Sequence, residues 1–410
     1  TPSENIGHLP WGCSFYCYSI NFVSLFSHLA KSGNLVTFIA LENLYMKLLQ
    51  LCVLAMFTLL FLACGGQSSD TSSALVEQQQ YEWKLVTSWP KNFPGLGKGP
   101  ETFAKYVERM SGGRLKIKVF GAGQMVPGFE VFDTVSSGAA EMGHSGSYYW
   151  KGKAPASQVF TAIPFGMNAT EMNAWLHYGG GLELWREVYE PFNLIPFAGG
   201  NSGVQMAGWF KKEINRVEDL KGLKMRIPGL GGEVLKKLGG IPVALTGGEL
   251  FTALQSGAID ATEWVGPYND LAFGFHKAAK YYYYSGWHEP SANLEFMVNK
   301  HAFEALPKDL QAIIEVATRA VNQDMWDEYT AANNSSMQAL VETHGVDMRP
   351  LPADVMIALR EASVEVMQEQ SDADPMFKKV YDSYSDFQSK VMKYHQISEF
   401  EYYKNRSISS

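Results

Sequence analysis

One arginine stands at the end of a short apolar stretch and is followed by residues that turn the chain. Arg226 lies in Met-Arg-Ile-Pro-Gly, residues 225–229, and its apolar neighbours are typical of a buried strand end. A guanidinium group is permanently charged, and its planar fork matches a carboxylate with two parallel hydrogen bonds. Arg226 is therefore a candidate for binding an organic acid, although an arginine at a strand end is more commonly a surface salt-bridge partner.

Catalytic signatures are scarce in the rest of the chain. Glu263 and His288 offer a carboxylate and an imidazole, which in one cleft can act as general base and general acid. The serines in 143–146 and 200–203 lie between glycines but lack the G-x-S-x-G spacing of a nucleophile elbow. His288 has no second histidine at the spacing of a zinc protease. The residues therefore favour a binding protein over an enzyme.

The elements that must position these side chains alternate between strands and helices. Residues 83–88 and 114–120 have the alternating pattern of strands, and an amphipathic helix is expected between them at 101–110. The same order returns in residues 194–265, so two α/β lobes are predicted. After Pro307 the pattern is that of long helices, over 308–343 and 353–393, with a strand-like interruption at 346–351.

The first part of the chain predicts export. Residues 48–63 are apolar except for Gln50 and Thr58 and follow a short basic start at Met46-Lys47. Such a segment is typical of a signal peptide and is short for a membrane span. The following Ala63-Cys64-Gly65-Gly66 resembles a bacterial lipobox, with Phe61 where leucine is usual. Cys64 would then carry the lipid.

These features divide the first 80 residues into three parts. We expect residues 1–45 to be spurious upstream sequence, 46–63 a lipoprotein-type signal peptide and 64–80 a polar tether. The alternative is a pair of membrane helices at 18–30 and 48–63. All three parts are excluded from the prediction of the fold.

The body after the tether has the composition of an exported globular protein. Residues 1–63 contain two acids and two bases, so the body carries the whole net charge of −8, which argues against nucleic acid as a partner. No cysteine follows Cys64, which excludes disulfide frameworks and cysteine-based zinc sites from the body. The roughly 350 residues from Cys64 onward suffice for two hydrophobic cores.

Several separated motifs occur in an order that resembles the solute-binding proteins of TRAP transporters. They are Lys221–Gly229, Glu249–Asp260 and Ala261–Pro267, preceded by 83–88, 112–118 and 135–142. The resemblance covers about residues 81–395. It implies an α/β, two-lobe periplasmic solute-binding fold with a ligand cleft between the lobes and long C-terminal helices. Lobe I is then expected to comprise 81–203 and 291–325, lobe II to comprise 204–290, and helices in 326–410 to pack across both.

Three stretches look most like the branch of this family that binds 2-oxo acids such as pyruvate with a metal ion: 205–210, 263–264 and 287–290. That resemblance implies that Arg226 holds the substrate carboxylate. It also implies that Gln205, Glu263 and the backbone carbonyl of Trp264 hold a hard cation, sodium or calcium, which bridges the carboxylate and the 2-oxo oxygen. Further substrate contacts are expected from Gln205, Tyr148, Tyr149 and Glu289.

Each of these residues also has a purely structural interpretation. Gln205 could cap a sheet edge, Glu263 could be a surface acid, and Tyr148 and Tyr149 could belong to a lobe core. The sequence does not separate pyruvate from longer 2-oxo acids or from lactate, nor sodium from calcium. It also leaves open whether the C-terminal helices cross their own lobes or exchange with a second copy in a homodimer.

The resemblance implies a receptor rather than an enzyme. It would work in the periplasm, anchored by lipid on Cys64, and deliver a small carboxylate to the two membrane subunits of a TRAP permease. Two alternatives remain at this point. One is an exported lyase or hydrolase that uses Glu263 and His288, and the other is a ligand-sensing domain that reports to a receptor.

Overall fold

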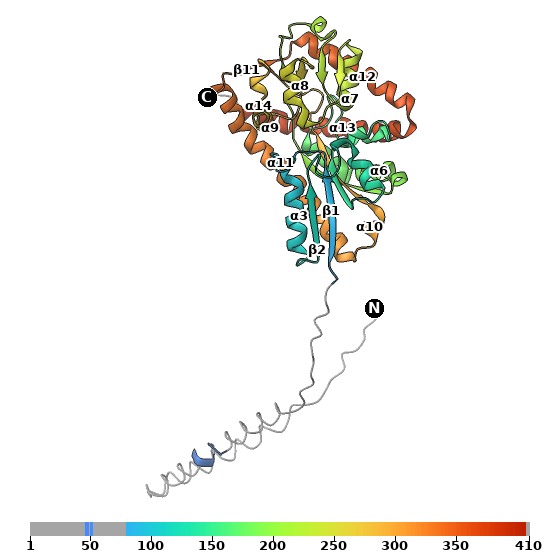
Figure 1. The fold of residues 1–410 in the computed structure, drawn as a ribbon, viewed down its shortest axis with the longest axis vertical. Coiled ribbons are helices and arrows are strands. Elements are labelled where there is room, and N and C mark those ends of the chain that lie inside the picture. The colour runs from blue at the N-terminus through green and yellow to red at the C-terminus, as the bar shows by residue number, and fades with distance from the viewer. Residues whose placement is uncertain (1–45, 49, 52–78, 407–410) are drawn as a thin grey trace, which may run out of the picture. The chain divides into compact units, whose positions relative to one another are not determined.

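The computed structural model describes residues 46–48, 50–51 and 79–406 (Figure 1). All elements from the first strand onward belong to one compact unit, residues 78–410. The expected upstream segment, Cys64 and nearly all of the expected signal peptide and tether lie outside the described residues. None of the helices described is both long enough and apolar enough to cross a membrane.

The first sheet has five strands in the order β2-β1-β3-β10-β4. Their bounds are β1 Tyr81–Thr87, β2 Leu115–Phe120, β3 Met142–Ser145, β4 Leu194–Asn201 and β10 Asn293–Asn299. Strands β1, β2 and β3 are parallel, whereas β10 runs antiparallel to β3 and β4. Leu85 packs on Phe103 of helix α3 (Lys98–Met110) from one face of the sheet, and Val86 packs on the other face. Strand β1 is therefore covered by side chains on both faces.

The second sheet has six strands in the order β11-β9-β5-β8-β6-β7. Their bounds are β5 Gly208–Phe210, β6 Lys224–Arg226, β7 Ile241–Val243, β8 Ala261–Thr262, β9 Tyr281–Tyr284 and β11 Asp347–Pro350. Strand β8 comes later in the chain than β6 and β7, yet it lies between β5 and β6. Arg226 is the register partner of Thr262, so the residue that follows β8, Glu263, reaches the end of β6.

Helices cover both sheets. They are α3, α4 (Val131–Ser136), α5 (Ala169–Tyr178), α6 (Gly181–Tyr189), α7 (Gly229–Lys237), α8 (Leu250–Ser256), α9 (Pro267–Phe273) and α10 (Lys300–Glu304). Short 3-10 helices link the elements: η1 Gly128–Glu130, η2 Ser147–Trp150, η3 Pro155–Phe160, η4 Glu190–Phe192, η5 Val217–Leu220, η6 Gly247–Glu249 and η7 Phe275–Lys277. The arrangement confirms the predicted α/β fold.

Long helices complete the chain: α11 (Lys308–Glu342), α12 (Ala353–Ala373), α13 (Pro375–Ile397) and α14 (Glu399–Arg406). Helix α11 packs on α3 and β4 of the first sheet and on α9 of the second, so it joins the two parts (Figure 1). Helix α12 packs on α7, and α13 packs on α5 and α6. The predicted long C-terminal helices are confirmed, whereas the bounds proposed for the two lobes stay a prediction.

The helical stretch expected over 353–393 is interrupted once. Asp374 has an extended backbone, with φ −137° and ψ 113°, and its side chain accepts a hydrogen bond of 2.7 Å from the N–H of Phe377. Pro375 occupies the first position of α13, where its missing N–H is not needed. A helix cap and a proline therefore start a new helix within a continuous apolar pattern.

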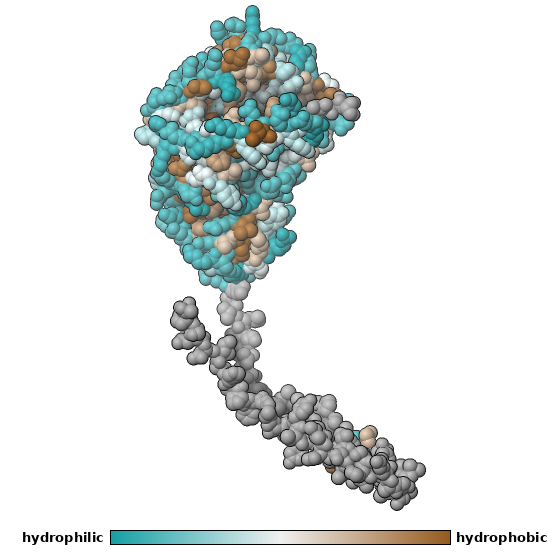
Figure 2. Space-filling view, turned by 180° about the vertical axis from the view of Figure 1, so that it is seen from behind, coloured by the Kyte–Doolittle hydropathy of each residue, from teal (hydrophilic) through white to brown (hydrophobic). Residues whose placement is uncertain are grey.

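Aromatic side chains supply much of the core, as the composition indicates. The ring of Phe160 stacks on those of Trp175 and Trp185, with centroids 5.6 and 4.9 Å apart. Seen from behind, hydrophilic side chains cover most of the surface and apolar ones form only small groups (Figure 2). The apolar side chains are thus mainly interior.

One carboxyl group is buried within the first sheet. Glu295 of β10 accepts hydrogen bonds from the indole N–H of Trp150 (2.6 Å) and from the hydroxyl of Tyr189 (2.7 Å). Neither partner carries a charge, and burial raises the pKa of Glu295 to about 7. Its proton is therefore retained in the native state well above the pH at which an exposed glutamate releases it.

The effect of this group on stability depends on pH. Between pH of about 4.5 and about 7 the native state holds a proton that the unfolded chain has released, so rising pH destabilises the fold. We expect the advantage of wild type over Glu295→Gln to shrink by about 3 kcal/mol across this window. Urea unfolding from pH 4.5 to 7.5 measures it, with the exposed Glu82→Gln as control. A constant difference between wild type and Glu295→Gln would contradict the assignment.

Candidate ligand-binding site

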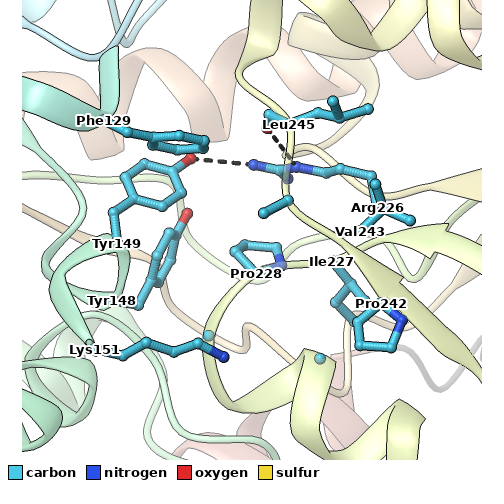
Figure 3. Close-up of a pocket in the computed structure, with 13 residues that line it drawn as sticks. Phe129, Tyr148, Tyr149, Lys151, Arg226, Ile227, Pro228, Pro242, Val243 and Leu245 are labelled. Atoms are coloured by element: carbon cyan, nitrogen blue, oxygen red, sulfur yellow. Dashed lines mark hydrogen bonds between the residues drawn. The ribbon is translucent and has the colours of Figure 1, made fainter. Parts of the chain in front are cut away.

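Two charged side chains meet where β6 and β8 end. Arg226 and Glu263 have exposed fractions of 1% and 0%, and Nη1 of Arg226 forms an ion pair with Oε1 of Glu263. The guanidinium also donates through Nε to the carbonyl of Leu245 (3.3 Å) and through Nη2 to the hydroxyl of Tyr149 (3.1 Å) (Figure 3). Burial lowers the pKa of Arg226, but Glu263, Tyr149, Tyr148 and Glu289 together raise it by more, so the net pKa is raised. The ion pair and the two hydrogen bonds therefore hold the guanidinium of Arg226 in place.

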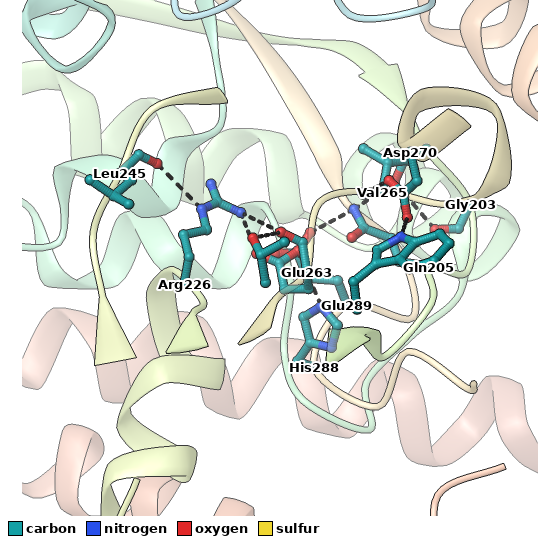
Figure 4. Close-up of polar contacts among 12 residues, drawn as sticks. Gly203, Gln205, Arg226, Leu245, Glu263, Val265, Asp270, His288 and Glu289 are labelled. Carbon is teal, nitrogen blue, oxygen red and sulfur yellow. Dashed lines mark hydrogen bonds and ion pairs between the residues drawn. The ribbon is translucent and has the colours of Figure 1, made fainter. Parts of the chain in front are cut away.

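A second carboxyl group lies beside this pair. Gln205 donates through Nε2 to Oε2 of Glu289 (2.8 Å) and to Oγ of Ser202 (3.1 Å), while its own Oε1 is buried without a partner (Figure 4). Burial raises the pKa of Glu289 well above its ordinary value, Glu263 raises it further and Arg226 opposes the shift. One guanidinium thus faces two buried carboxyl groups.

The donor atoms of this cluster fit a hard cation. Glu263, His288 and Glu289 can each present one ligand atom within 4.8 Å of the others. The unpartnered Oε1 of Gln205 adds a buried amide oxygen, an atom that normally has a partner. Carboxylate and amide oxygens suit calcium or sodium, and the single imidazole is too little for a typical zinc site. The residues present therefore fit the cation that the sequence predicts.

A cavity of about 310 Å³ opens beside the arginine (Figure 3). One side comes from η1, η2 and the residue that follows, and the other from the ends of β6 and β7 with the start of α7. The lining residues are Phe129, Tyr148, Tyr149, Lys151, Arg226, Ile227, Pro228, Gly229, Gly232, Pro242, Val243, Ala244 and Leu245. Most of these side chains are apolar, and the two charged ones, Arg226 and Lys151, are both positive.

Glycine at position 229 permits the close approach of these two sides. Its φ is +58°, and a Cβ atom there would lie 3.1 Å from Cβ of Tyr148. A larger residue would be strained in this backbone conformation and would push the tyrosine away. The start of α7 is thereby held against η2.

A smaller cavity, of about 10 Å³, is lined by Trp89, Gln205 and Trp264 among others, and it shares Tyr148 and Tyr149 with the larger one. The ring of Trp264 lies 4.9 Å from the guanidinium carbon of Arg226. Cation–π attraction therefore adds to the contacts that hold the arginine. The two cavities and the cluster of polar groups form one site.

The structure brings together the residues that the sequence singles out. Arg226 contacts Glu263 and Tyr149, and Gln205 contacts Glu289. The two groups meet where Glu263 and Glu289 present oxygen atoms within 4.8 Å of each other. Tyr148 lines both cavities. Glu263 is not a surface acid, and the side chain of Gln205 serves Glu289 rather than a sheet edge. Their roles toward a ligand or a cation stay predictions.

Sequence reasoning missed other residues of the site. Trp89 follows the first strand directly, in Ser-Trp-Pro, and that position at a strand end was a usable signal. Phe129 and Leu245 lie in turns that carry no motif. Asp270 is buried near Val265, and nothing in Pro-Tyr-Asn-Asp distinguishes it from an ordinary helix start.

The fold has two sheets covered by helices and joined by α11, with a charged site between apolar walls. This combination is that of a solute-binding protein. Residues 85–374 match the model of the bacterial extracellular solute-binding proteins, family 7, and the chain belongs to this family. It is the solute-binding protein of a TRAP transporter, works outside the cytoplasm and is a transport receptor rather than an enzyme. The prediction drawn from the spaced motifs is confirmed.

Three similar proteins have known or named ligands. The monocarboxylate 2-oxoacid-binding periplasmic protein of Nostoc sp. (strain PCC 7120) is 43% identical over 87% of this chain and 97% of its own. A TRAP periplasmic solute-binding protein from Colwellia psychrerythraea, solved with bound calcium and pyruvate, is 47% identical with a TM-score of 0.78. Another, from Pseudoalteromonas atlantica T6c with bound sodium and pyruvate, is 46% identical with a TM-score of 0.78. These two cover 80% and 81% of this chain and all of their own.

The buried ion pair predicts a large effect of one substitution. Arg226→Ala leaves the carboxylate of Glu263 buried without its counter-charge, so we expect the free energy of unfolding to fall by about 3–5 kcal/mol. Chemical denaturation measures it. Adding Glu263→Gln to this variant should restore part of the loss, because the unpaired charge is then absent. Arg349→Ala, which removes a partly exposed arginine paired with Glu213 and Asp347, is the control and should change stability little. If Arg226→Ala and Arg349→Ala lowered the free energy of unfolding equally, this account would be contradicted.

Proposed function

We propose that this receptor captures a small monocarboxylate 2-oxo acid of the pyruvate class together with sodium or calcium. The observation that carries the proposal is the buried cluster in which one arginine faces an oxygen-rich donor set, Gln205, Glu263 and Glu289. The named ligands of the relatives from Nostoc, Colwellia and Pseudoalteromonas support it. The acid is then delivered to the membrane subunits of a TRAP permease.

Each side chain of the cluster has a distinct task in this proposal. Arg226 holds the ligand carboxylate through its fork of N–H donors, in place of the hydroxyl of Tyr149 or beside it. Gln205, Glu263 and the backbone carbonyl of Trp264 hold the cation, which supplies positive charge to the carboxylate and the 2-oxo oxygen when bound. Glu289, Tyr148 and Tyr149 complete the polar contacts with the substrate.

Release and capture require the two sides of the cleft to separate. We assign residues 81–203 and 291–325 to one lobe, 204–290 to the other, and 326–410 to helices that pack across both. Contacts between the proposed lobes include a hydrogen bond that Arg226 donates to the hydroxyl of Tyr149 and one that Asn269 donates to the carbonyl of Pro94. Lys151 and Glu233 add an ion pair of 2.7 Å. A ligand favours the closed arrangement only through contacts that the open one lacks.

We also propose that the receptor is anchored to the membrane by lipid on Cys64. The support is the apolar run of 48–63, the small residues around Cys64 and the polar stretch that separates it from β1. Mass analysis of the membrane-extracted protein tests this directly. An unmodified mature protein would contradict the anchor.

A homodimer is a further part of the proposal. The end of α13 and α14 expose several large apolar side chains, namely Met392, Tyr394, Ile397, Phe400 and Tyr402. Exposed apolar groups gathered in this way are typical of protein–protein contacts. Sedimentation equilibrium measures the oligomeric state of wild type and of the double variant Ile397→Asp/Phe400→Asp, which we expect to be monomeric. A monomeric wild type would contradict the homodimer.

The ligand and the cation are tested together by isothermal titration of the soluble body, from Gln67 onward. We expect pyruvate to bind in sodium or calcium buffer and its affinity to fall at least tenfold after chelation in a sodium-free buffer, because one buried positive charge is then missing. Arg226→Lys keeps the charge but loses the fork, and should weaken binding by a similar factor. Pyruvate binding that ignores the cation would reject the metal bridge. Absence of binding in every buffer would reject pyruvate itself.

A further inference from the structure

A buried carboxyl group faces the peptide that follows Trp264, one of the proposed cation ligands. Asp270 of α9 has an exposed fraction of 1%. Its Oδ2 accepts hydrogen bonds from the indole N–H of Trp209 (3.0 Å) and the hydroxyl of Tyr282 (2.7 Å). Its Oδ1 faces the backbone N–H of Val265, at 3.5 Å (Figure 4). All three donors are uncharged.

The position of Asp270 is fixed by the chain around it. Helix α9 starts two residues after Val265, and the backbone N–H of Asp270 donates to the carbonyl of Gly266 (2.9 Å). Burial raises the pKa of Asp270 to about 7, its three hydrogen bonds oppose the rise, and the charge of Glu263 adds to it. A positive charge bound nearby would therefore favour the charged form of Asp270.

The peptide between residues 264 and 265 links this carboxyl group to the proposed cation site. Its N–H end belongs to Val265 and points toward Asp270, whereas its carbonyl belongs to Trp264. A carboxylate that accepts from the N–H end polarises the whole peptide group and makes the carbonyl oxygen a stronger ligand. The charge of Asp270 therefore acts on the cation site without occupying it.

We propose that Asp270 is a positioning residue that holds and polarises the Trp264 carbonyl toward the cation and makes the site favour divalent over monovalent ions. The inference rests on the proposed function, because it takes the Trp264 carbonyl as a cation ligand. The electrostatic attraction between a fixed charge and an ion is proportional to the charge of the ion. Loss of the Asp270 charge thus costs a calcium complex about twice the free energy that it costs a sodium complex.

The experiment compares the two cations in wild type and in Asp270→Asn. Calcium and sodium are titrated separately into chelated protein saturated with pyruvate, at pH 8, and the fluorescence of the neighbouring tryptophans or the heat of binding is followed. We expect the Kd for calcium to rise on the order of 10- to 100-fold, the range found for partners of metal ligands. The Kd for sodium should rise by only the square root of that factor, about 3- to 10-fold.

Glu295→Gln is the matched control, because Glu295 is also a buried carboxyl that accepts from one indole and one tyrosine hydroxyl. It contacts no residue of the cation site, so the ratio of the two dissociation constants should stay at the wild-type value. Thermal unfolding of the cation-free proteins shows whether both variants are folded. If Asp270→Asn does not fold, the double variant Asp270→Asn/Tyr282→Phe takes its place in the same comparison. The second substitution removes the hydroxyl that would face the new amide.

The outcomes separate this inference from the proposed function. If both dissociation constants rise by the same factor, or neither changes, Asp270 serves packing alone and the inference is overturned while the receptor proposal stands. If wild-type protein binds pyruvate but responds to neither cation, the metal bridge fails and the inference fails with it. A larger loss for calcium than for sodium, seen in Asp270→Asn and absent from Glu295→Gln, supports it.

Discussion

The burial of Arg226 against Glu263 is the interaction on which the site depends. Two charges taken out of water gain little net stability over a well-packed apolar pair, and either one alone is strongly destabilising. The fold holds both because β8 lies next to β6, which places Glu263 at the end of the strand that carries Arg226. Leu245, Tyr149 and Trp264 then fill the remaining sides of the guanidinium. An arrangement so expensive for stability is understandable if a ligand needs the charge.

The balance of charge explains why an acid and a cation would bind together. Glu263 and Glu289 face a single guanidinium, and a carboxylate ligand would add a third negative group. Burial and the charge of Glu263 already raise the pKa of Glu289, and a third negative group would raise it further. A bound cation removes this excess, and the unpartnered oxygen of Gln205 offers it one more ligand. In the proposed function, the same cluster would couple the affinity for the acid to the affinity for the ion.

Much of this architecture could be predicted from local sequence patterns, because strands and helices follow from the spacing of apolar residues. The expected strand at 114–120 and helix at 308–343 appear as β2 and α11. The interruption at Asp374-Pro375 had a signal in the cap and the proline, but the apolar spacing continues across it. The neighbourhood of Arg226 and Glu263 is different. It depends on β8 lying between β5 and β6, an order that apolar spacing does not specify. Only the resemblance to a family supplied it.

Asp270 and Glu295 show why buried charge alone does not identify a binding residue. Both accept hydrogen bonds from one indole and one tyrosine hydroxyl, and burial raises the pKa of each to about 7. His144 is equally buried, and burial lowers its pKa to about 4. It lies in the first sheet, where it accepts a hydrogen bond from the indole N–H of Trp89. Perturbed pKa values thus occur in the scaffold as well as in the site. What separates Asp270 is its third contact, the peptide whose opposite end, the Trp264 carbonyl, is a proposed cation ligand. Connectivity through the backbone, rather than burial, therefore gives this carboxyl its proposed role.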